Sequence, residues 1–450
     1  MKTILFAGAA TFALSTGMTA AQDLKFPVGE GDFNWDSYNS FADANDLSGK
    51  SMDMTGPWTG LDDQNFSNVI AYFEAATGAN VNYSGSDSFE QDIVISTQAN
   101  SAPNIAVFPQ PGLISDLAKK GVITPLDPEN ADWIAENYAA GQSWVDLASF
   151  EGPDGEKNLY AMPFKIDVKS LVWYVPEAFD EAGYDIPETM EDLKALTQQI
   201  ADDGETPWCI GLGSGAATGW PATDWVEDLM LRTQPPETYD KWVTNEIPFD
   251  DPAVVGAIEE YGFFARNDAF VNGGSSAVAN TDFRDSPGGL FTFPPECYMH
   301  HQATFIPTFF PEGTEMGEDV DFFYFPAYAE KDLGKPVLGA GTMFSITKDS
   351  DVAQAFVKFL QTPIAHEVWM AQSGFLTPFK DANVDVFPSD TQRNLNEILT
   401  NATTFRFDGS DLMPGEIGAG AFWTGMVDYT TGADAAKVAS DIQDRWSAIK

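Results

Sequence analysis

The feature that most constrains the fold is an alternation of short apolar segments with amphipathic ones between residues 51 and 121. Residues 51–56 and 81–83 alternate apolar and polar side chains, as β-strands do, and residues 104–108 form a third strand-like run. The segment between the first two strands has apolar residues at helical spacing and stops at Gly78. This strand–helix order with short connections predicts an α/β fold with a doubly wound parallel sheet.

The segments that follow the three strands are the expected ligand-binding positions, because open parallel sheets bind ligands beyond the carboxyl ends of their strands. These segments are Gly56-Pro57-Trp58, Gly85-Ser86-Asp87 and Pro109-Gln110-Pro111. They offer aromatic and hydrogen-bonding side chains, and none has the glycine fingerprint of a phosphate-binding loop. The pattern therefore argues against a nucleotide ligand.

Two further apolar stretches indicate that the chain forms two lobes. Residues 162–174 predict one long strand that leaves the first lobe, and residues 336–346 predict a strand that returns to it. A chain of 450 residues is also longer than one hydrophobic core ordinarily accommodates. We expect lobe 1 over residues 51–166 and 337–385, and lobe 2 over residues 167–336 and 386–450. The cleft between such lobes is the expected ligand site.

The N-terminus predicts secretion. Lys2 precedes a short apolar core, and Thr19-Ala20-Ala21 supplies the small residues of a cleavage site, so residues 1–21 are expected to be a signal peptide. Residues 22–50 form an N-terminal extension with no clear period. No later stretch has the ~18 consecutive apolar residues of a transmembrane helix. The mature protein is therefore expected in the periplasm, without direct membrane insertion.

Acidic side chains dominate the composition. The chain has 68 Asp and Glu against 23 Lys and Arg, a formal net charge of −45. Such a charge repels nucleic acid and anionic membranes, so neither is an expected partner. A solvated acidic surface suited to salty surroundings explains this charge better than a specific cationic ligand does.

The stretch from Trp208 to Trp225 combines glycines with tryptophans. Glycines let a ligand approach the backbone, indole faces pack on the C–H faces of sugar rings, and a carboxylate such as Asp224 accepts hydrogen bonds from hydroxyls. A buried glycine-rich turn beneath core tryptophans fits the same residues equally well. Cys209 lies in this stretch, and an oxidising compartment favours its disulfide with Cys297 over two free buried thiols.

The reactive side chains form no catalytic or metal-binding pattern. Adjacent His300 and His301 point to opposite faces of a strand, so a packed or surface pair is favoured over a zinc site. No pair among the many carboxylates stands out as the two acids of a glycosidase, and no nucleophile elbow is present. We therefore expect no enzyme activity, no metal and no cofactor.

Several motifs together carry a family resemblance. They are Gly56-Pro57-Trp58, Gly85-Ser86-Asp87-Ser88-Phe89-Glu90, Phe108-Pro109-Gln110-Pro111-Gly112, Trp208-Cys209-Ile210-Gly211 through Gly219-Trp220-Pro221, Asp224-Trp225, and Cys297-Tyr298-Met299-His300. From about residue 47 to the C-terminus the chain resembles the extracellular solute-binding proteins of carbohydrate ABC importers, most closely their α-glucoside-binding branch. Residues 22–50 and the extreme acidity are not required by that family. His301 stands where a permanently charged residue is expected.

The resemblance implies a periplasmic-binding-protein-like fold, in which two α/β lobes joined by hinge strands hold a sugar in the cleft between them. It implies that Trp58, Trp173 and Trp220 stack on sugar rings. It also implies that Asp87, Gln110 and Asp224 accept hydrogen bonds from hydroxyls. Gln302 and Met343 are expected to line the cleft.

The expected function is that of a monomeric periplasmic component of an ABC importer. It captures an α-glucoside such as sucrose, trehalose or maltose by lobe closure and delivers it to the membrane permease. A secreted glycoside hydrolase that uses an Asp/Glu pair is the alternative from the enzyme class. A binding protein for a polyol or a glycosylated compatible solute is a further alternative.

Overall fold

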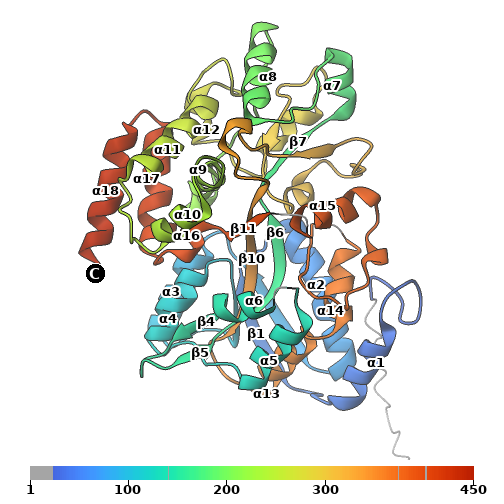
Figure 1. The fold of residues 1–450 in the computed structure, drawn as a ribbon. Helices are drawn as coiled ribbons and strands as arrows, with labels where there is room; N and C mark the ends of the chain where they lie inside the picture. The colour runs from blue at the N-terminus through green and yellow to red at the C-terminus, as the bar shows by residue number, and fades with distance from the viewer. Residues whose placement is uncertain (1–23, 140, 373, 401–402, 450) are drawn as a thin grey trace, which may run out of the picture.

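The computed structural model describes residues 24–139, 141–372, 374–400 and 403–449, so the predicted signal peptide at residues 1–21 lies outside the described residues. The chain forms two lobes, one above the other in the view of Figure 1, with the N-terminal strand–helix units below. This two-lobed α/β architecture confirms the predicted fold class. The lobe boundaries given above stay predictions.

The lower lobe is organised around a mixed sheet of order β11-β10-β3-β1-β2, with β6 paired to β10. Its strands are β1 (Ser51–Gly56), β2 (Asn80–Gly85), β3 (Ile105–Phe108), β6 (Met162–Val168), β10 (Pro336–Ile346) and β11 (Thr404–Phe407). β1 pairs in parallel with both β2 and β3, while β10 runs antiparallel to β3 and β6. The carboxyl ends of β1, β2 and β3 therefore meet at one edge, as the sequence predicts.

Two hydrophobic cores hold the helices in place. Helices that bury side chains in the first are α1 (Trp35–Ala44), α2 (Gly60–Thr77), α3 (Phe89–Gln98), α4 (Pro111–Lys119), α5 (Pro128–Asn137), α6 (Gly141–Leu147), α13 (Asp351–Phe359), α14 (Pro363–Met370) and α15 (Asp390–Thr400). Helices of the second are α7 (Pro176–Ala182), α8 (Met190–Asp202), α9 (Trp220–Thr233), α10 (Pro236–Val243), α11 (Pro252–Ala265), α12 (Ser275–Val278), α17 (Trp423–Thr430) and α18 (Ala435–Ala448). The short helix α16 (Gly409–Leu412) follows β11, and β4 (Ser149–Glu151) pairs with β5 (Lys157–Leu159).

Helix α2 shows how the local sequence produces these elements. Its apolar residues Phe66, Val69, Ile70 and Phe73 recur at helical spacing, and all four are buried against the sheet core. The helix ends at Gly78, whose φ of 71° lies in the left-handed region that favours glycine. At its other end, α2 begins at Gly60, shortly after the carboxyl end of β1 at Gly56.

The chain crosses between the lobes at a break that the sequence does not predict. The prediction of one strand over residues 162–174 is wrong, because β6 ends at Val168 and β7 (Leu171–Tyr174) belongs to a separate sheet with β8 (His300–His301) and β9 (Asp321–Tyr324). The side chains at the break are held by carboxylates of the upper lobe. Lys169 Nζ donates to Asp224 at 2.8 Å, and Ser170 Oγ donates to Asp228 at 2.7 Å.

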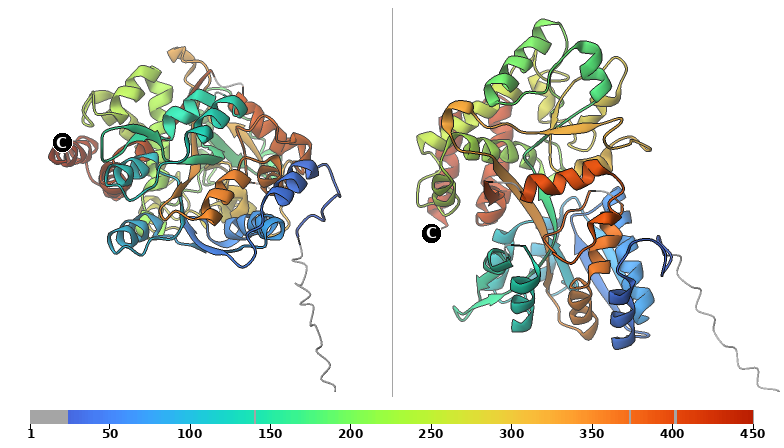
Figure 2. Two further views of the ribbon diagram at one scale, coloured as in Figure 1. Left: turned by 90° about the horizontal axis from the view of Figure 1, so that it is seen from below. Right: turned by 45° about the vertical axis from the view of Figure 1, so that its right-hand side comes forward.

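The N-terminal extension packs along the outside of the lower lobe, where α1 lies beside α2 and α14 (Figure 2). Tyr72 Oη donates to the carbonyl oxygen of Phe26 at 2.6 Å, and Glu367 accepts from the backbone N–H of Asn34 at 2.6 Å. The predicted disulfide is present: Cys209 and Cys297 are bonded, with their Cα atoms 5.5 Å apart. None of the described helices combines the length and apolarity needed to cross a bilayer.

Candidate ligand-binding cleft

A cavity lies between the two lobes, at the carboxyl ends of β1, β2 and β3. Its volume of about 180 Å³ accommodates a small solute. The lower lobe contributes Trp58, Asp87 and Gln110, and the upper lobe contributes Trp220 and Asp224. The structure thus brings five of the eight predicted ligand-binding residues to one cavity. Their contact with a ligand stays a prediction.

Aromatic side chains form one wall of the cavity. The centroid of the Trp220 ring lies 4.9 Å from that of Phe283 and 5.9 Å from that of Phe305. The Trp220 side chain is partly exposed. Trp220 opens α9 after Gly219, where a Cβ atom would come within 2.2 Å of the Trp423 carbonyl oxygen, so only glycine allows this close approach. Trp58 lines the cavity too, but it is only 6% exposed. Trp220 is therefore the more accessible platform for an apolar face of a ligand.

The remaining three predicted residues do not line the cavity. Trp173 is fully buried and donates from Nε1 to the backbone oxygen of Gln302 at 2.8 Å. The Gln302 side chain accepts from the backbone N–H of Ala303, and Met343 is buried within β10. Trp173 and Met343 lie within strands and pack in the hydrophobic core, and Gln302 follows β8 and is buried as well.

Two buried lysines, Lys165 and Lys169, line the cavity. Lys165 on β6 donates to both oxygens of Asp167, at 2.7 and 2.9 Å. Lys169, at the break between β6 and β7, donates to Asp224 and to Asp408. Burial opposes its charge, yet these carboxylates raise the pKa of Lys169 well above its ordinary value. Both ammonium groups are therefore held by protein carboxylates.

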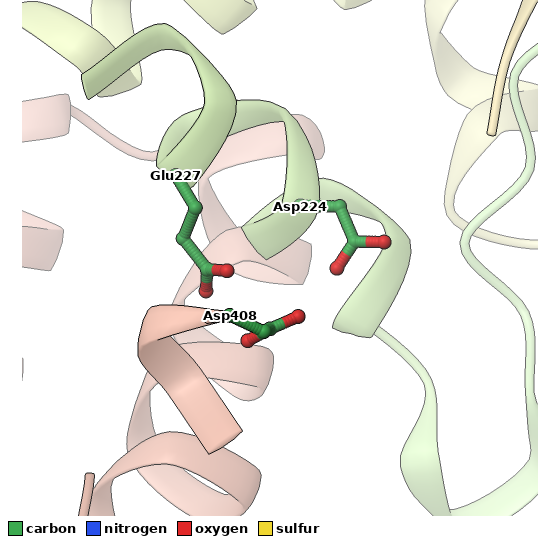
Figure 3. A group of neighbouring side chains, drawn as sticks. All are labelled: Asp224, Glu227 and Asp408. Atoms are coloured by element: carbon green, nitrogen blue, oxygen red, sulfur yellow. The ribbon is translucent and has the colours of Figure 1, made fainter. Parts of the chain in front are cut away.

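Three buried carboxylates come together beside Lys169. Asp224 and Glu227 lie one turn apart on α9, and Asp408 precedes α16; Figure 3 shows the three groups facing a common region. Burial raises the pKa of Asp224 and of Glu227 well above the ordinary range. Burial would also raise the pKa of Asp408, but Lys169 and hydrogen bonds lower it.

Each member of this carboxylate group has a structural role. Glu227 accepts from the backbone N–H groups of Gly409 and Ser410, which fixes α16 against α9. Asp224 and Asp408 both bind the Lys169 ammonium, so this group already contains a cation. Asp224 keeps its second oxygen, Oδ2, buried and without a hydrogen-bond partner.

Unpartnered polar atoms gather around this cavity. Five of the buried side-chain atoms without a hydrogen-bond partner belong to its lining: Asp62 Oδ1, Gln110 Oε1, Asp224 Oδ2, Thr342 Oγ1 and Trp423 Nε1. Buried polar atoms are ordinarily paired, because an unpaired one loses its hydration without compensation. They come from the lower lobe, from β10 and from the upper lobe, so a polar ligand in the cavity reaches partners on every side.

The cleft mouth carries an ion pair between the lobes. Arg284 of the upper lobe donates to both oxygens of Asp87 of the lower lobe, at 3.0 and 2.9 Å. Asp282 holds the other edge of the same guanidinium at 2.7 and 2.8 Å. Asp87, predicted to contact the ligand, thus also joins the two sides of the cleft.

Sequence reasoning missed Asp62, Lys165, Lys169, Arg284 and Asp408. Asp62 resembles an ordinary acidic residue in the first turn of a helix, yet it is 6% exposed and faces the cavity. Burial, opposed by Lys165, raises the pKa of Asp62 to about 7. The only signal in the sequence was position: Asp62 lies four residues after Trp58, in the segment that follows the predicted strand 51–56.

Comparisons with known proteins agree with this architecture. Residues 58–367 match the family described as bacterial extracellular solute-binding protein. The chain is 63% identical over 458 aligned residues, covering all of both chains, to the alpha-glucosides-binding periplasmic protein AglE of Rhizobium meliloti. It is 40% identical, over 88% of this chain and 92% of the relative, to the osmoprotective compounds-binding protein GgtB of Synechocystis sp..

Among solved structures, the bacterial solute receptor AcbH superimposes with a TM-score of 0.76. The match covers 89% of this chain and 99% of that chain at 17% identity. At this identity the likeness shows a shared fold and nothing about the ligand.

Proposed function

The chain belongs to the bacterial extracellular solute-binding proteins, and we propose that it captures a neutral α-glucoside and presents it to an ABC importer. The family consists of binding proteins located outside the cytoplasm, not of enzymes, so the hydrolase alternative falls away. The name of the 63% identical relative supports α-glucosides as the ligand class, with sucrose, trehalose and maltose as candidates.

The observation that carries the proposal is the set of unpartnered polar atoms beside an aromatic wall. Trp220 offers an apolar face, while Gln110 Oε1 and Asp224 Oδ2 are buried acceptors without donors. A pyranose supplies the complement, since it has C–H faces and a rim of hydroxyls. We assign stacking to Trp220 with Trp58 beside it, and hydroxyl recognition to Asp87, Gln110, Asp224 and Asp62.

Lobe closure supplies the delivery step. We assign the hinge to the break at residues 169–170 and to β10, which carries the chain back to the lower lobe. Ligand that contacts both lobes stabilises the closed form, and the permease distinguishes that form from the open one. We further propose a monomer, secreted to the periplasm after removal of residues 1–21.

A glycosylated compatible solute is the second candidate ligand. The 40% identical relative is named for osmoprotective compounds, and the net charge of −45 suits salty surroundings. A glucoside of glycerol presents the same ring to Trp220 with a smaller second group.

A thermal-shift panel tests the proposal. The mature protein is heated with sucrose, trehalose, maltose, glucosylglycerol and free polyols, because a ligand that binds only the native state raises the melting midpoint. At a hundred-fold excess over the Kd the stabilisation is about 2.7 kcal/mol. We expect at least one α-glucoside to raise the midpoint and free polyols to leave it unchanged. A panel in which no glucoside shifts the midpoint contradicts the proposal.

A further inference from the structure

Each lysine and arginine that lines the cavity, among the described residues, forms an ion pair with a carboxylate of the protein. Lys165 is paired with Asp167, Lys169 with Asp224 and Asp408, and Arg284 with Asp87 and Asp282. An anionic ligand would have to displace a carboxylate from one of these pairs. Within the described residues, the cavity lining offers no other lysine or arginine.

Three cavity carboxyl groups, in contrast, have no ion-pair partner among the described residues: Asp62, Glu90 and Asp411. Asp62 and Asp411 are each 6% exposed, and Glu90 accepts from the Gln110 amide at 2.8 Å. Burial raises the pKa of all three groups, and the nearby carboxylates raise that of Asp411 further. Lys165 lowers the pKa of Asp62 and Lys169 lowers that of Asp411, but each lysine is paired with another carboxylate, and burial outweighs its effect.

The unpartnered atoms show the same bias toward acceptors. Asp62 Oδ1 and Gln110 Oε1 accept hydrogen bonds, and both belong to side chains that are more than nine-tenths buried. The other unpartnered atoms of the described lining are Asp224 Oδ2, which accepts when the carboxyl is ionised and donates when it is protonated, one obligate donor, Trp423 Nε1, and the Thr342 hydroxyl, which serves either way. A ligand that fits this lining brings more donors than acceptors. An ammonium brings three donors and no acceptor, and a hydroxyl brings one donor, whereas a carboxylate brings acceptors only.

We propose that the cavity selects its ligand by charge, accepting amino-substituted glycosides alongside neutral ones and excluding anionic ones through Asp62 and Glu90. This inference rests on the proposed function, because it assumes that a glycoside occupies the cavity. The carboxylate of Asp62, with Glu90 in the same lining, gives an ammonium-bearing sugar a counter-charge, while a carboxylate-bearing sugar meets like charge with every cation of the described cavity lining already engaged.

The test uses matched probes that differ only in charge. Sucrose, trehalose and maltose are each compared with the derivative in which the 6-hydroxyl of one glucosyl unit is replaced by an amine and with the derivative in which the same carbon is oxidised to a carboxylate. Affinities are measured by titration calorimetry at about pH 8, where Asp62 is ionised. We expect the amine to bind about ten-fold more tightly than the neutral parent and the carboxylate at least ten-fold more weakly.

Two substitutions on neighbouring residues link this preference to the cavity. Asp62→Asn removes one unpaired carboxylate and is expected to reduce the amine-over-neutral affinity ratio about three-fold or more. Asp63→Asn makes the same change one residue later, outside the cavity lining, and is expected to leave the ratio unchanged. Circular dichroism verifies that each variant folds, and Glu90→Gln replaces Asp62→Asn if the latter does not.

The outcomes separate the two proposals. A neutral sugar that binds no more tightly than its carboxylate overturns charge selection while the proposed function stands. Binding of the amines alone supports charge selection and overturns the neutral ligand class. An affinity ratio that is the same in Asp62→Asn and the unaltered protein, or no binding by any probe, overturns charge selection.

Discussion

Asp62 is predicted to lower the stability of the ligand-free protein, and its replacement by asparagine is predicted to restore that stability. The carboxyl group is buried, its Oδ1 has no hydrogen-bond partner, and its pKa rises from 3.8 to about 7. The asparagine amide keeps the shape of the carboxylate and removes its charge. Lys165 keeps its ion pair with Asp167 at 2.7 Å, so Asp62→Asn does not leave Lys165 unpaired.

The magnitude follows from the displaced pKa. A rise of about three units at 1.36 kcal/mol per unit corresponds to about 4 kcal/mol of destabilisation when the folded protein holds Asp62 ionised. Below about pH 4 the group is protonated in both the folded and unfolded states and contributes no such penalty. Between about pH 4 and 7 the unfolded chain loses this proton while the folded chain keeps it, so stability falls as pH rises. Above pH 7 the penalty is fully present.

Thermal unfolding of the unaltered protein, Asp62→Asn and Asp63→Asn at about pH 4.5 and pH 8 measures this effect. For a chain of this length, 4 kcal/mol corresponds to a midpoint shift of about 4 °C. We expect Asp62→Asn to raise the midpoint by up to that amount at the higher pH and by much less at the lower pH, with Asp63→Asn unchanged at both. Equal shifts at both pH values would refute the assignment of the penalty to Asp62 ionisation.

Three further predictions concern the cleft and its support. Trp220→Ala is expected to weaken sugar binding about ten- to hundred-fold in calorimetry while the melting midpoint stays nearly unchanged; unchanged affinity would remove Trp220 from the site. Arg284→Gln breaks the ion pair to Asp87 across the cleft and is expected to lower affinity a few-fold at low salt, with a smaller effect at high salt. An effect independent of ionic strength would contradict that electrostatic role. Reduction of the Cys209–Cys297 disulfide is expected to lower the unfolding free energy by about 2–5 kcal/mol, measured by denaturant titration with and without reductant; coincident titration curves would argue against a stabilising role.

The α/β fold class and the position of Trp58, Asp87 and Gln110 at the cavity could be predicted from the sequence, because both depend on local patterns. Trp58, Asp87 and Gln110 follow β1, β2 and β3 directly, so a parallel sheet brings them to one edge. Strand periodicity and helix-stopping residues are short-range signals that a single sequence carries. The topology then determines the position of the site before any side-chain contact is known.

The features that the sequence did not reveal depend on long-range contacts. Lys169 holds Asp408, 239 residues away, and Arg284 holds Asp87, 197 residues away. No local period distinguishes these charges from the many others on an acidic chain. The prediction of one strand over residues 162–174 failed for a related reason. Their apolar residues recur with strand-like spacing on both sides of the break, whereas Lys169 and Ser170 turn toward carboxylates of the other lobe.

Under the proposed function, the unpartnered groups favour a ligand that engages both lobes. Asp62 and Gln110 lie on the lower side and Asp224 and Trp423 on the upper side, and each leaves one buried polar atom unsatisfied in the ligand-free cavity. A solute that reaches only one side satisfies half of these atoms and leaves the rest desolvated, whereas one that spans the cleft satisfies both sets. Asp224 also holds Lys169 at the break between β6 and β7, so a ligand hydroxyl bound to its second oxygen would lie directly beside the proposed hinge. Differential affinity for the closed form is what shifts the population toward it, and this arrangement concentrates that difference in ligands with donors at both ends.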